Sequence, residues 1–218
     1  MFQVRDLLLT QFARVGKAVS SPARLKLLDL LAQGEKSVET LARQAGLTVK
    51  NTSAHLRTLR SASLVEGRRD GAYVFYRLAD ESAVGFLRAL EELARRQIAE
   101  VEQIVRDHFR SLDGLEPISA DALRERMGAG DVTLLDVRPP DEYRAGHIPG
   151  AISVPITELE ARLAELPPGR DVVAYCRGPY CLLSLEAVAT LRAQGRSARR
   201  LAVGLPDWRA MGYPVQSG

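Results

Sequence analysis

The sequence predicts two domains of different fold class: a mainly α-helical N-terminal domain and an α/β C-terminal domain with a mostly parallel sheet. Two observations support this division. Residues 2–78 contain four short helical patterns followed by one β-hairpin, whereas strands and helices alternate from residue 119 onward. A chain of 218 residues is long enough for both. We place the boundary in residues 113–117, which gives domains 1–112 and 113–218.

The first domain opens with four helical patterns. Ser20-Ser21-Pro22 ends the first helix and starts the second, with Pro22 in its first turn. Gly46 closes the third, and Thr48 caps the fourth. The last two, joined by a short turn, have the helix-turn-helix pattern. The expected helices are residues 2–19, 22–32, 38–45 and 49–60.

A β-hairpin follows, with strands at residues 64–67 and 73–78 and a polar tip at residues 68–71 that contains an Asp-Gly turn. A basic hairpin after a helix-turn-helix makes a winged helix. Residues 36–78 hold eight cations and three anions, a net +5 that leaves −2 for the rest of the chain. This suggests a polyanionic partner, although a solvated surface would account for the charge equally well.

Residues 80–112 are expected to form one long helix. Asp80 can cap it, and apolar residues recur every three or four positions from Val84 to Leu112. Such a helix would be about 45 Å long. Its apolar stripe needs a partner, and pairing with its copy and with the first helix would make it the dimer interface.

The N-terminal domain resembles the ArsR/SmtB family of winged-helix repressors over about residues 10–80. The similar segments are VGKAVSSPARLKLLDLLAQGE and LTVKNTSAHLRTLRSASLVEGRRDGAYVFYRL. The resemblance implies a homodimer that places its recognition helix in the major groove of double-stranded DNA and its wing on the adjacent backbone. The implied DNA-binding residues are Lys50, Asn51, Thr52, Ser53, His55 and Arg57 on the helix, and Arg68 and Arg69 on the wing.

The sequence departs from this family where many relatives bind a soft metal. Ser37 and Glu39 stand at the positions of two cysteines of the third helix, so no thiolate site is expected there. No two of His55, His108 and His147 have the spacing of a ligand pair. We therefore expect neither a regulatory metal nor a cofactor.

The second domain is expected to contain a parallel sheet covered by helices. Ligands of such sheets bind at the carboxyl ends of the strands. The strands are predicted at residues 133–137, 152–154, 172–175 and 199–202, and the helices at 119–127, 139–143, 157–166, 182–193 and 206–211.

Cys176 falls at such a strand end, in VVAYCRGPYCL. Convergent loop amides and the start of the following helix favour a thiolate there. The alternative is a small buried apolar residue. The only two cysteines of the chain, Cys176 and Cys181, flank this loop, which favours a working thiol in a reducing compartment.

The second domain resembles a rhodanese over about 100 residues. The similar segments are LLDVRPPDEYRAGHIPGAISVP, YCRGPYC and GLPDWRAMGYPV. The resemblance implies that Cys176 is the nucleophile and carries a persulfide. The backbone amides of the following loop would bind this persulfide, and the loop includes Arg177, Gly178, Tyr180 and Cys181. Arg177 can add a cation. Asp136, Arg138 and Glu142 would support the loop, through an Arg138–Glu142 or similar pair.

Cys181 departs from the rhodanese pattern, since active rhodaneses usually carry arginine at this position. Two interpretations remain open: an apolar residue at the start of a helix, or a resolving thiol that attacks a sulfenate or persulfide on Cys176. Without the arginine, polysulfide or a protein persulfide should be a better sulfur donor than thiosulfate.

Together these features predict a dimeric DNA-binding transcriptional regulator, a repressor, whose rhodanese domain senses or carries sulfane sulfur or an oxidant on Cys176. The alternative is a sulfurtransferase enzyme in which the winged helix serves dimerisation or localisation. No apolar run is long enough to span a membrane, and MFQVRDLLLTQF lacks the features of a secretory signal. A cytoplasmic location is expected.

Overall fold

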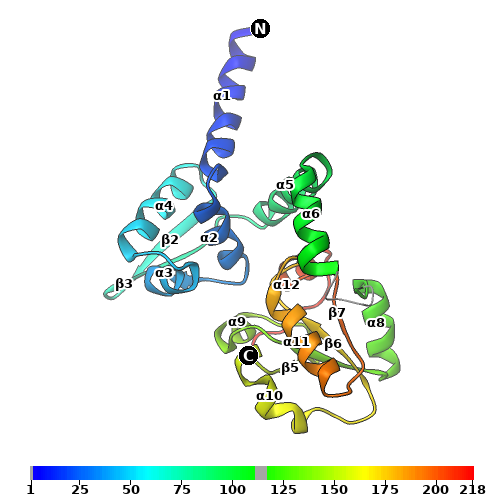
Figure 1. Cartoon of the computed structure of the whole chain (residues 1–218). Coiled ribbons are helices and arrows are strands. Elements are labelled where there is room, and N and C mark those ends of the chain that lie inside the picture. The colour runs from blue at the N-terminus through cyan, green and yellow to red at the C-terminus, as the bar shows by residue number, and fades with distance from the viewer. Residues whose placement is uncertain (1, 111–116) are drawn as a thin grey trace. The chain divides into compact units, whose positions relative to one another are not determined.

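The computed structural model describes residues 2–110 and 117–218 (Figure 1). The chain divides into two compact units, Met1–Leu87 and Arg88–Gly218. The predicted boundary at residues 113–117 lies, except for Pro117, outside the described residues. The division between the two compact units falls within a helix, because Arg88 and the residues after it contact the C-terminal part of the chain.

Four helices begin the first unit, as predicted. Thr48 Oγ1 accepts a hydrogen bond from the Asn51 N–H at 3.2 Å, and Gly46 ends the third helix with a φ of 70°. The core between the helices contains the fully buried Leu27, Leu41 and Leu56. The helices are α1 (Phe2–Val19), α2 (Pro22–Ala32), α3 (Val38–Ala45) and α4 (Val49–Ser61).

A three-stranded antiparallel sheet completes the winged helix, with β1 (Lys36–Ser37), β2 (Val65–Asp70) and β3 (Tyr73–Leu78) in the order β1-β3-β2. The predicted polar tip at residues 68–71 is wrong. The ladder continues to the Asp70–Tyr73 pair, so Arg68 and Arg69 lie within β2. A two-residue turn, with Gly71 at a φ of 58°, is enough to reverse the chain.

The single helix predicted over residues 80–112 is also wrong. The chain forms α5 (Ser82–Gln97), α6 (Ala99–Val105) and a π-helical turn (Arg106–Arg110). The break is at Ile98, whose φ of −112° and ψ of 105° are extended. Neither proline nor glycine marks it. The helical periodicity of the sequence continues across this position and gives no sign of the break.

The α/β part contains the predicted parallel sheet, in the order β5-β4-β6-β7. Val173 and Tyr175 pack in one apolar cluster and Val172 and Ala174 in another, so both faces of the sheet are covered. The strands are β4 (Val132–Asp136), β5 (Ile152–Ser153), β6 (Asp171–Tyr175) and β7 (Ala198–Arg200).

Five α-helices of the described residues belong to this part, and the carboxyl end of β6 meets the start of one of them. The predicted helix at 157–166 is a single α-helical turn between two 3₁₀ segments, Ile156–Glu158 and Leu163–Glu165. The helices are α8 (Ala120–Ala129), α9 (Pro140–Ala145), α10 (Leu159–Arg162), α11 (Leu182–Ala193) and α12 (Leu205–Ala210). Among all described residues, no helix has the length and apolar character needed to cross a membrane.

Candidate cysteine site and nucleic-acid interface

Residues 176–181, here called the cysteine loop, connect β6 to α11. Cys176 follows the last residue of β6 and is 2% exposed, while the half-buried Cys181 is the N-cap of α11. The two cysteines form a disulfide with a Cα–Cα distance of 6.4 Å, within the usual range. Ser184 Oγ lies 3.5 Å from Cys176 Sγ and donates to the Cys181 carbonyl at 3.3 Å. The loop thus brings together a strand end, a helix start and both sulfur atoms.

Hydrogen bonds from outside and inside the loop fix its backbone. The Leu205 N–H at the start of α12 donates to the Cys176 carbonyl at 3.3 Å. The buried Arg200 of β7 donates to the Pro179 carbonyl at 3.0 Å. Within the loop, the Cys181 N–H donates to the Gly178 carbonyl at 3.1 Å. The backbone that carries the two sulfurs is therefore held by two neighbouring elements.

Two ion pairs lie beside the loop, and they involve the residues predicted to support it. Arg138 pairs with Asp136 at 2.6 Å, both side chains fully buried. Glu142, also fully buried, pairs with Arg177 at 2.7 Å. The guanidinium of Arg177, which we expected to add a cation at the sulfur, is thus bound to a carboxylate. The Tyr175 hydroxyl donates to Asp136 at 2.5 Å, and burial raises the pKa of this hydroxyl well above its usual value.

Several residues at the site were not predicted. Arg200 holds a loop carbonyl, and Ser184, three positions after Cys181, lies beside the buried sulfur. Asp207 and Arg88 form an ion pair next to the loop. Asp207 belongs to the segment GLPDW, so its motif could have drawn attention to it. Nothing in the sequence pattern links Arg88 to the cysteines.

On the recognition helix α4, most but not all of the predicted DNA-binding residues reach solvent. Lys50, Asn51 and Arg57 are exposed, and Ser53 and His55 are half-buried. Thr52, however, is fully buried, because it lies on the core stripe with Leu56 and Leu59. Its hydroxyl donates to the Thr48 carbonyl at 3.0 Å, so a groove-facing role for Thr52 is wrong.

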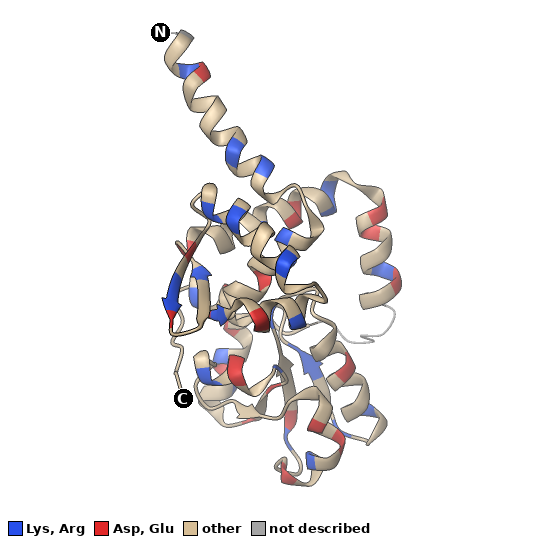
Figure 2. Ribbon diagram, turned by 90° about the vertical axis from the view of Figure 1, so that its left-hand side faces the viewer, with Lys and Arg blue, Asp and Glu red and all other residues tan. Residues whose placement is uncertain are grey.

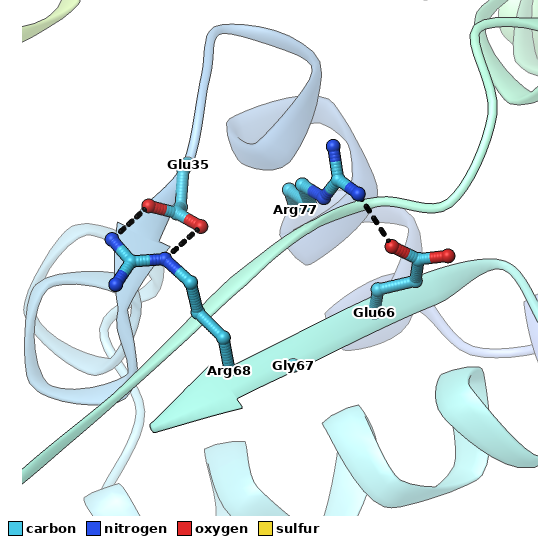
Figure 3. Close-up of a pocket in the computed structure, with 5 residues that line it drawn as sticks. All are labelled: Glu35, Glu66, Gly67, Arg68 and Arg77. Atoms are coloured by element: carbon cyan, nitrogen blue, oxygen red, sulfur yellow. Dashed lines mark hydrogen bonds and ion pairs between the residues drawn. The ribbon is translucent and has the colours of Figure 1, made fainter. Parts of the chain in front are cut away.

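The two wing arginines differ in their surroundings. Arg68 pairs with Glu35 at 2.6 Å and with Asp70 at 3.0 Å while remaining half-exposed. Figure 3 shows its pair with Glu35 beside a second pair, Arg77–Glu66, at a pocket of about 300 Å³. Arg69 donates instead to the backbone carbonyl of Gly71 at 3.2 Å.

Carboxylates therefore offset the charge of Arg68, and Arg69 provides the clearer positive charge at the wing. Figure 2 marks the lysines and arginines along the ribbon, including those of the hairpin and of the helices beside it.

Ser37, at one of the two positions discussed above for a soft-metal site, caps α3 by accepting a hydrogen bond from the Thr40 N–H at 3.2 Å. Across residues 2–110 and 117–218, no group of three or more His, Cys, Asp or Glu side chains is arranged to hold a metal ion. The serine thus has a structural use at this position.

Comparison with known proteins identifies both domains. Residues 21–66 match the family described as bacterial regulatory protein, arsR family, and residues 119–211 match the rhodanese-like domain. The HTH-type transcriptional regulator Rv0324 of Mycobacterium tuberculosis is 46% identical over 211 residues, which cover 97% of this chain and 92% of that protein. The chain belongs to the ArsR family of bacterial regulators. It is a DNA-binding transcriptional regulator of that family that carries a rhodanese-like domain, as predicted.

Other relatives match one half of this ArsR-family chain. A sulfurtransferase of Allochromatium vinosum is 36% identical over 100 residues, covering 45% of this chain and 92% of that protein. A solution structure of the homodimeric winged helix-turn-helix domain Mb0332 of Mycobacterium bovis is 41% identical and covers 43% of this chain and 87% of that one, with a TM-score of 0.41.

Proposed function

We propose that this ArsR-family regulator binds double-stranded DNA as a homodimer, as a repressor, and that its rhodanese-like domain senses sulfane sulfur or an oxidant through Cys176 and Cys181. The observation that carries the proposal is the disulfide between these two residues at the carboxyl end of β6. A regulator that works through reducible thiols and acts on DNA suits the cytoplasm.

The chemistry has two balanced steps. The Cys176 thiolate attacks the outer sulfur of a persulfide RSSH, which gives Cys176–S–S⁻ and releases RSH. The Cys181 thiol then attacks Cys176 Sγ, which forms the Cys176–Cys181 disulfide and expels HS⁻. With a peroxide, a sulfenate on Cys176 takes the place of the persulfide, and hydroxide leaves.

The surroundings of Cys176 support a persulfide or polysulfide donor over thiosulfate. Arg177 is engaged by Glu142, and position 181 is a cysteine instead of a cation. An anionic sulfur on Cys176 would depend on backbone N–H groups, which suit one terminal sulfur better than a sulfonate.

The exposed apolar side chains of α1 support the homodimer. Val4, Leu7, Leu8 and Phe12 are each more than half exposed. A contiguous apolar helix face of this kind is unusual for a monomer, and a second copy of the chain would cover it. The winged helix-turn-helix domain of Mycobacterium bovis, which is 41% identical in sequence, is itself homodimeric.

The alternative function is a sulfurtransferase, which the similarity to the sulfurtransferase of Allochromatium vinosum favours. In that case the persulfide on Cys176 would pass to an acceptor thiol instead of being resolved by Cys181. The half-buried position of Cys181, bonded to Cys176, argues for resolution.

Intact mass spectrometry combined with DNA binding tests the proposal. Reduced protein is exposed to polysulfide or peroxide, and affinity is measured on a duplex that the protein selects from a random library. Loss of two hydrogens together with changed affinity would support sensing. A persulfide that accumulates on Cys176 and passes its outer sulfur to added cyanide, while the affinity for DNA stays unchanged, would favour the enzyme. Cys176→Ser is the control, and should abolish both responses.

A further inference from the structure

Two residues of the cysteine loop contact the helical segment 88–109, which begins in α5. The first contact is between Gly178 and Arg88: a Cβ added at Gly178 would lie 2.8 Å from Arg88 Nη2. The Arg88 guanidinium therefore packs directly on the loop backbone. It is held there by Asp207 at 2.5 Å and by Glu91 at 2.7 Å. Arg88 is only 24% exposed and Asp207 10%, so this is a largely desolvated ion pair.

Asp207 connects Arg88 to the backbone around Cys176. While Oδ1 binds Arg88, Oδ2 accepts the Gly204 N–H at 3.0 Å. Gly204 has no room for a side chain, because a Cβ there would overlap the carbonyl of Arg177. The next residue, Leu205, donates its N–H to the Cys176 carbonyl. One carboxylate thus links the helix α5 to the start of the cysteine loop.

The second contact lies at the other side of the loop. The ring of Tyr180 packs edge to face on Phe109 of the π-helical turn, with 5.8 Å between ring centroids. Burial raises the pKa of the Tyr180 hydroxyl, as expected for a ring partly covered by its neighbours. The segment 88–109 therefore touches the loop at two residues that lie between Cys176 and Cys181.

We propose that Arg88 is a positioning residue of the cysteine loop, and that it transmits the bonding state of the two cysteines to α5. Reduction of the disulfide takes two electrons and two protons from a dithiol, which leaves as its own disulfide. This step removes the covalent bond between Cys176 and Cys181. Gly178 lies between the two cysteines, so a change in the loop backbone would reach the Arg88 guanidinium that packs on it. The proposal rests on the sensing function proposed above.

Arg88→Ala tests this on the full-length protein, with Arg96→Ala as the matched control. Arg96 is an exposed arginine of the same helix that pairs with Glu92. The dissociation constant for the selected duplex is measured for the oxidised and the dithiothreitol-reduced forms of each protein. We expect the two states of wild type and of Arg96→Ala to differ about tenfold, and those of Arg88→Ala to differ less than about twofold.

A second measurement uses the reciprocity of coupled equilibria. If reduction of the cysteine loop changes the affinity for DNA, then bound DNA must shift the thiol–disulfide equilibrium of the loop by the same factor. Titration against a dithiothreitol redox buffer, with and without duplex, should show this shift in wild type and not in Arg88→Ala. A purely structural arginine would alter stability and leave the shift in place.

The outcomes separate the two proposals. If wild type shows equal affinities in both states, sensing fails, and the role of Arg88 fails with it. If wild type responds and Arg88→Ala responds equally, only the role of Arg88 is overturned. Should Arg88→Ala not fold, Asp207→Asn replaces it, since asparagine can still accept the Gly204 N–H while it removes the charge that holds Arg88.

Discussion

Arg177 and Glu142 form a two-point ion pair beside the cysteine loop, with Nη2–Oε1 at 2.7 Å and Nε–Oε2 at 3.0 Å. Glu142 is fully buried, so Arg177 provides its charge partner inside the protein. The arginine next to the reactive position therefore serves to hold the loop onto α9. Besides Arg200, two further arginines anchor the loop by different routes: Arg177 from within the α/β domain and Arg88 from α5.

The first prediction concerns this ion pair. Removing the buried charge in Glu142→Gln leaves Arg177 without its carboxylate and should lower the free energy of unfolding by about 3–5 kcal/mol. Urea unfolding followed by the fluorescence of Trp208, the only tryptophan of the chain, reports on this domain. The control Glu158→Gln removes a half-exposed partner of Arg162 and should cost less than about 1 kcal/mol. Equal costs for the two variants would contradict the prediction.

The second prediction separates DNA positioning from sequence readout. Arg57→Ala should weaken binding to all duplexes and reduce the salt slope by about one, since one phosphate contact is lost. Asn51→Ala should instead change the preference among duplexes. Fluorescence anisotropy over a salt series measures both. Thr52→Val is the control: its buried side chain should leave DNA preference unaltered, and a changed preference would show that Thr52 reaches the groove.

Local signals allowed much of the fold to be predicted from the sequence. Gly46 and Thr48 mark helix ends through backbone conformation and capping, which depend on near neighbours alone. The alternation of strands and helices likewise predicted the parallel sheet. Thr52 was misplaced because it is polar in a helix of polar residues, although its phase relative to Leu56 puts it in the core.

The features that were not predicted depend on contacts between distant residues. Arg88 and Asp207 are 119 positions apart, and the periodicity of α5 carries no information about this partner. The break at Ile98 was also missed, because no proline or glycine marks it in the sequence. The choice of Glu142 as the partner of Arg177 required the spatial positions of α9 and the loop, which charge pattern alone does not give.

The third prediction is a pH dependence that arises from Tyr175. Burial and the Asp136 carboxylate raise the pKa of this hydroxyl above its usual value of 10.0. The folded state therefore retains the proton longer than the unfolded state, so the stabilisation is complete below pH 10 and declines as pH rises above it. Urea unfolding between about pH 9 and 11 should show a steeper loss for wild type than for Tyr175→Phe. Equal slopes of the free energy of unfolding against pH for the two proteins would contradict this prediction.

The fourth prediction is that metal ions do not regulate this protein except through the two cysteines. In the Cys176→Ser/Cys181→Ser double variant, zinc, cadmium and arsenite should leave the affinity for DNA unchanged. The physical reason is the loss of both soft ligands, since Ser37 and Glu39 occupy the other candidate positions. A metal response that persists in the double variant, measured by anisotropy with a chelator control, would reveal a site built from other residues.

The fifth prediction is that one substitution at position 181 converts the site from disulfide formation to sulfur transfer from thiosulfate. Cys181→Arg removes the resolving thiol and places at the N-cap of α11 the cation that active rhodaneses usually carry there. Thiosulfate uptake onto Cys176 should then rise by about tenfold or more, because a charged donor is worth about 1.5–3 kcal/mol to an anion. Uptake is measured by intact mass, and by the thiocyanate that forms when cyanide accepts the sulfur from Cys176.

Cys181→Ser is the matched control for this substitution, since it removes the thiol without adding charge. It should hold a stable persulfide from polysulfide yet remain slow with thiosulfate. Both variants should lose the change in DNA affinity caused by oxidation, because neither can form the bond to Cys176. If Cys181→Ser still switches its DNA affinity after polysulfide treatment, then the persulfide on Cys176 alone is the signal, and the disulfide is not required for sensing.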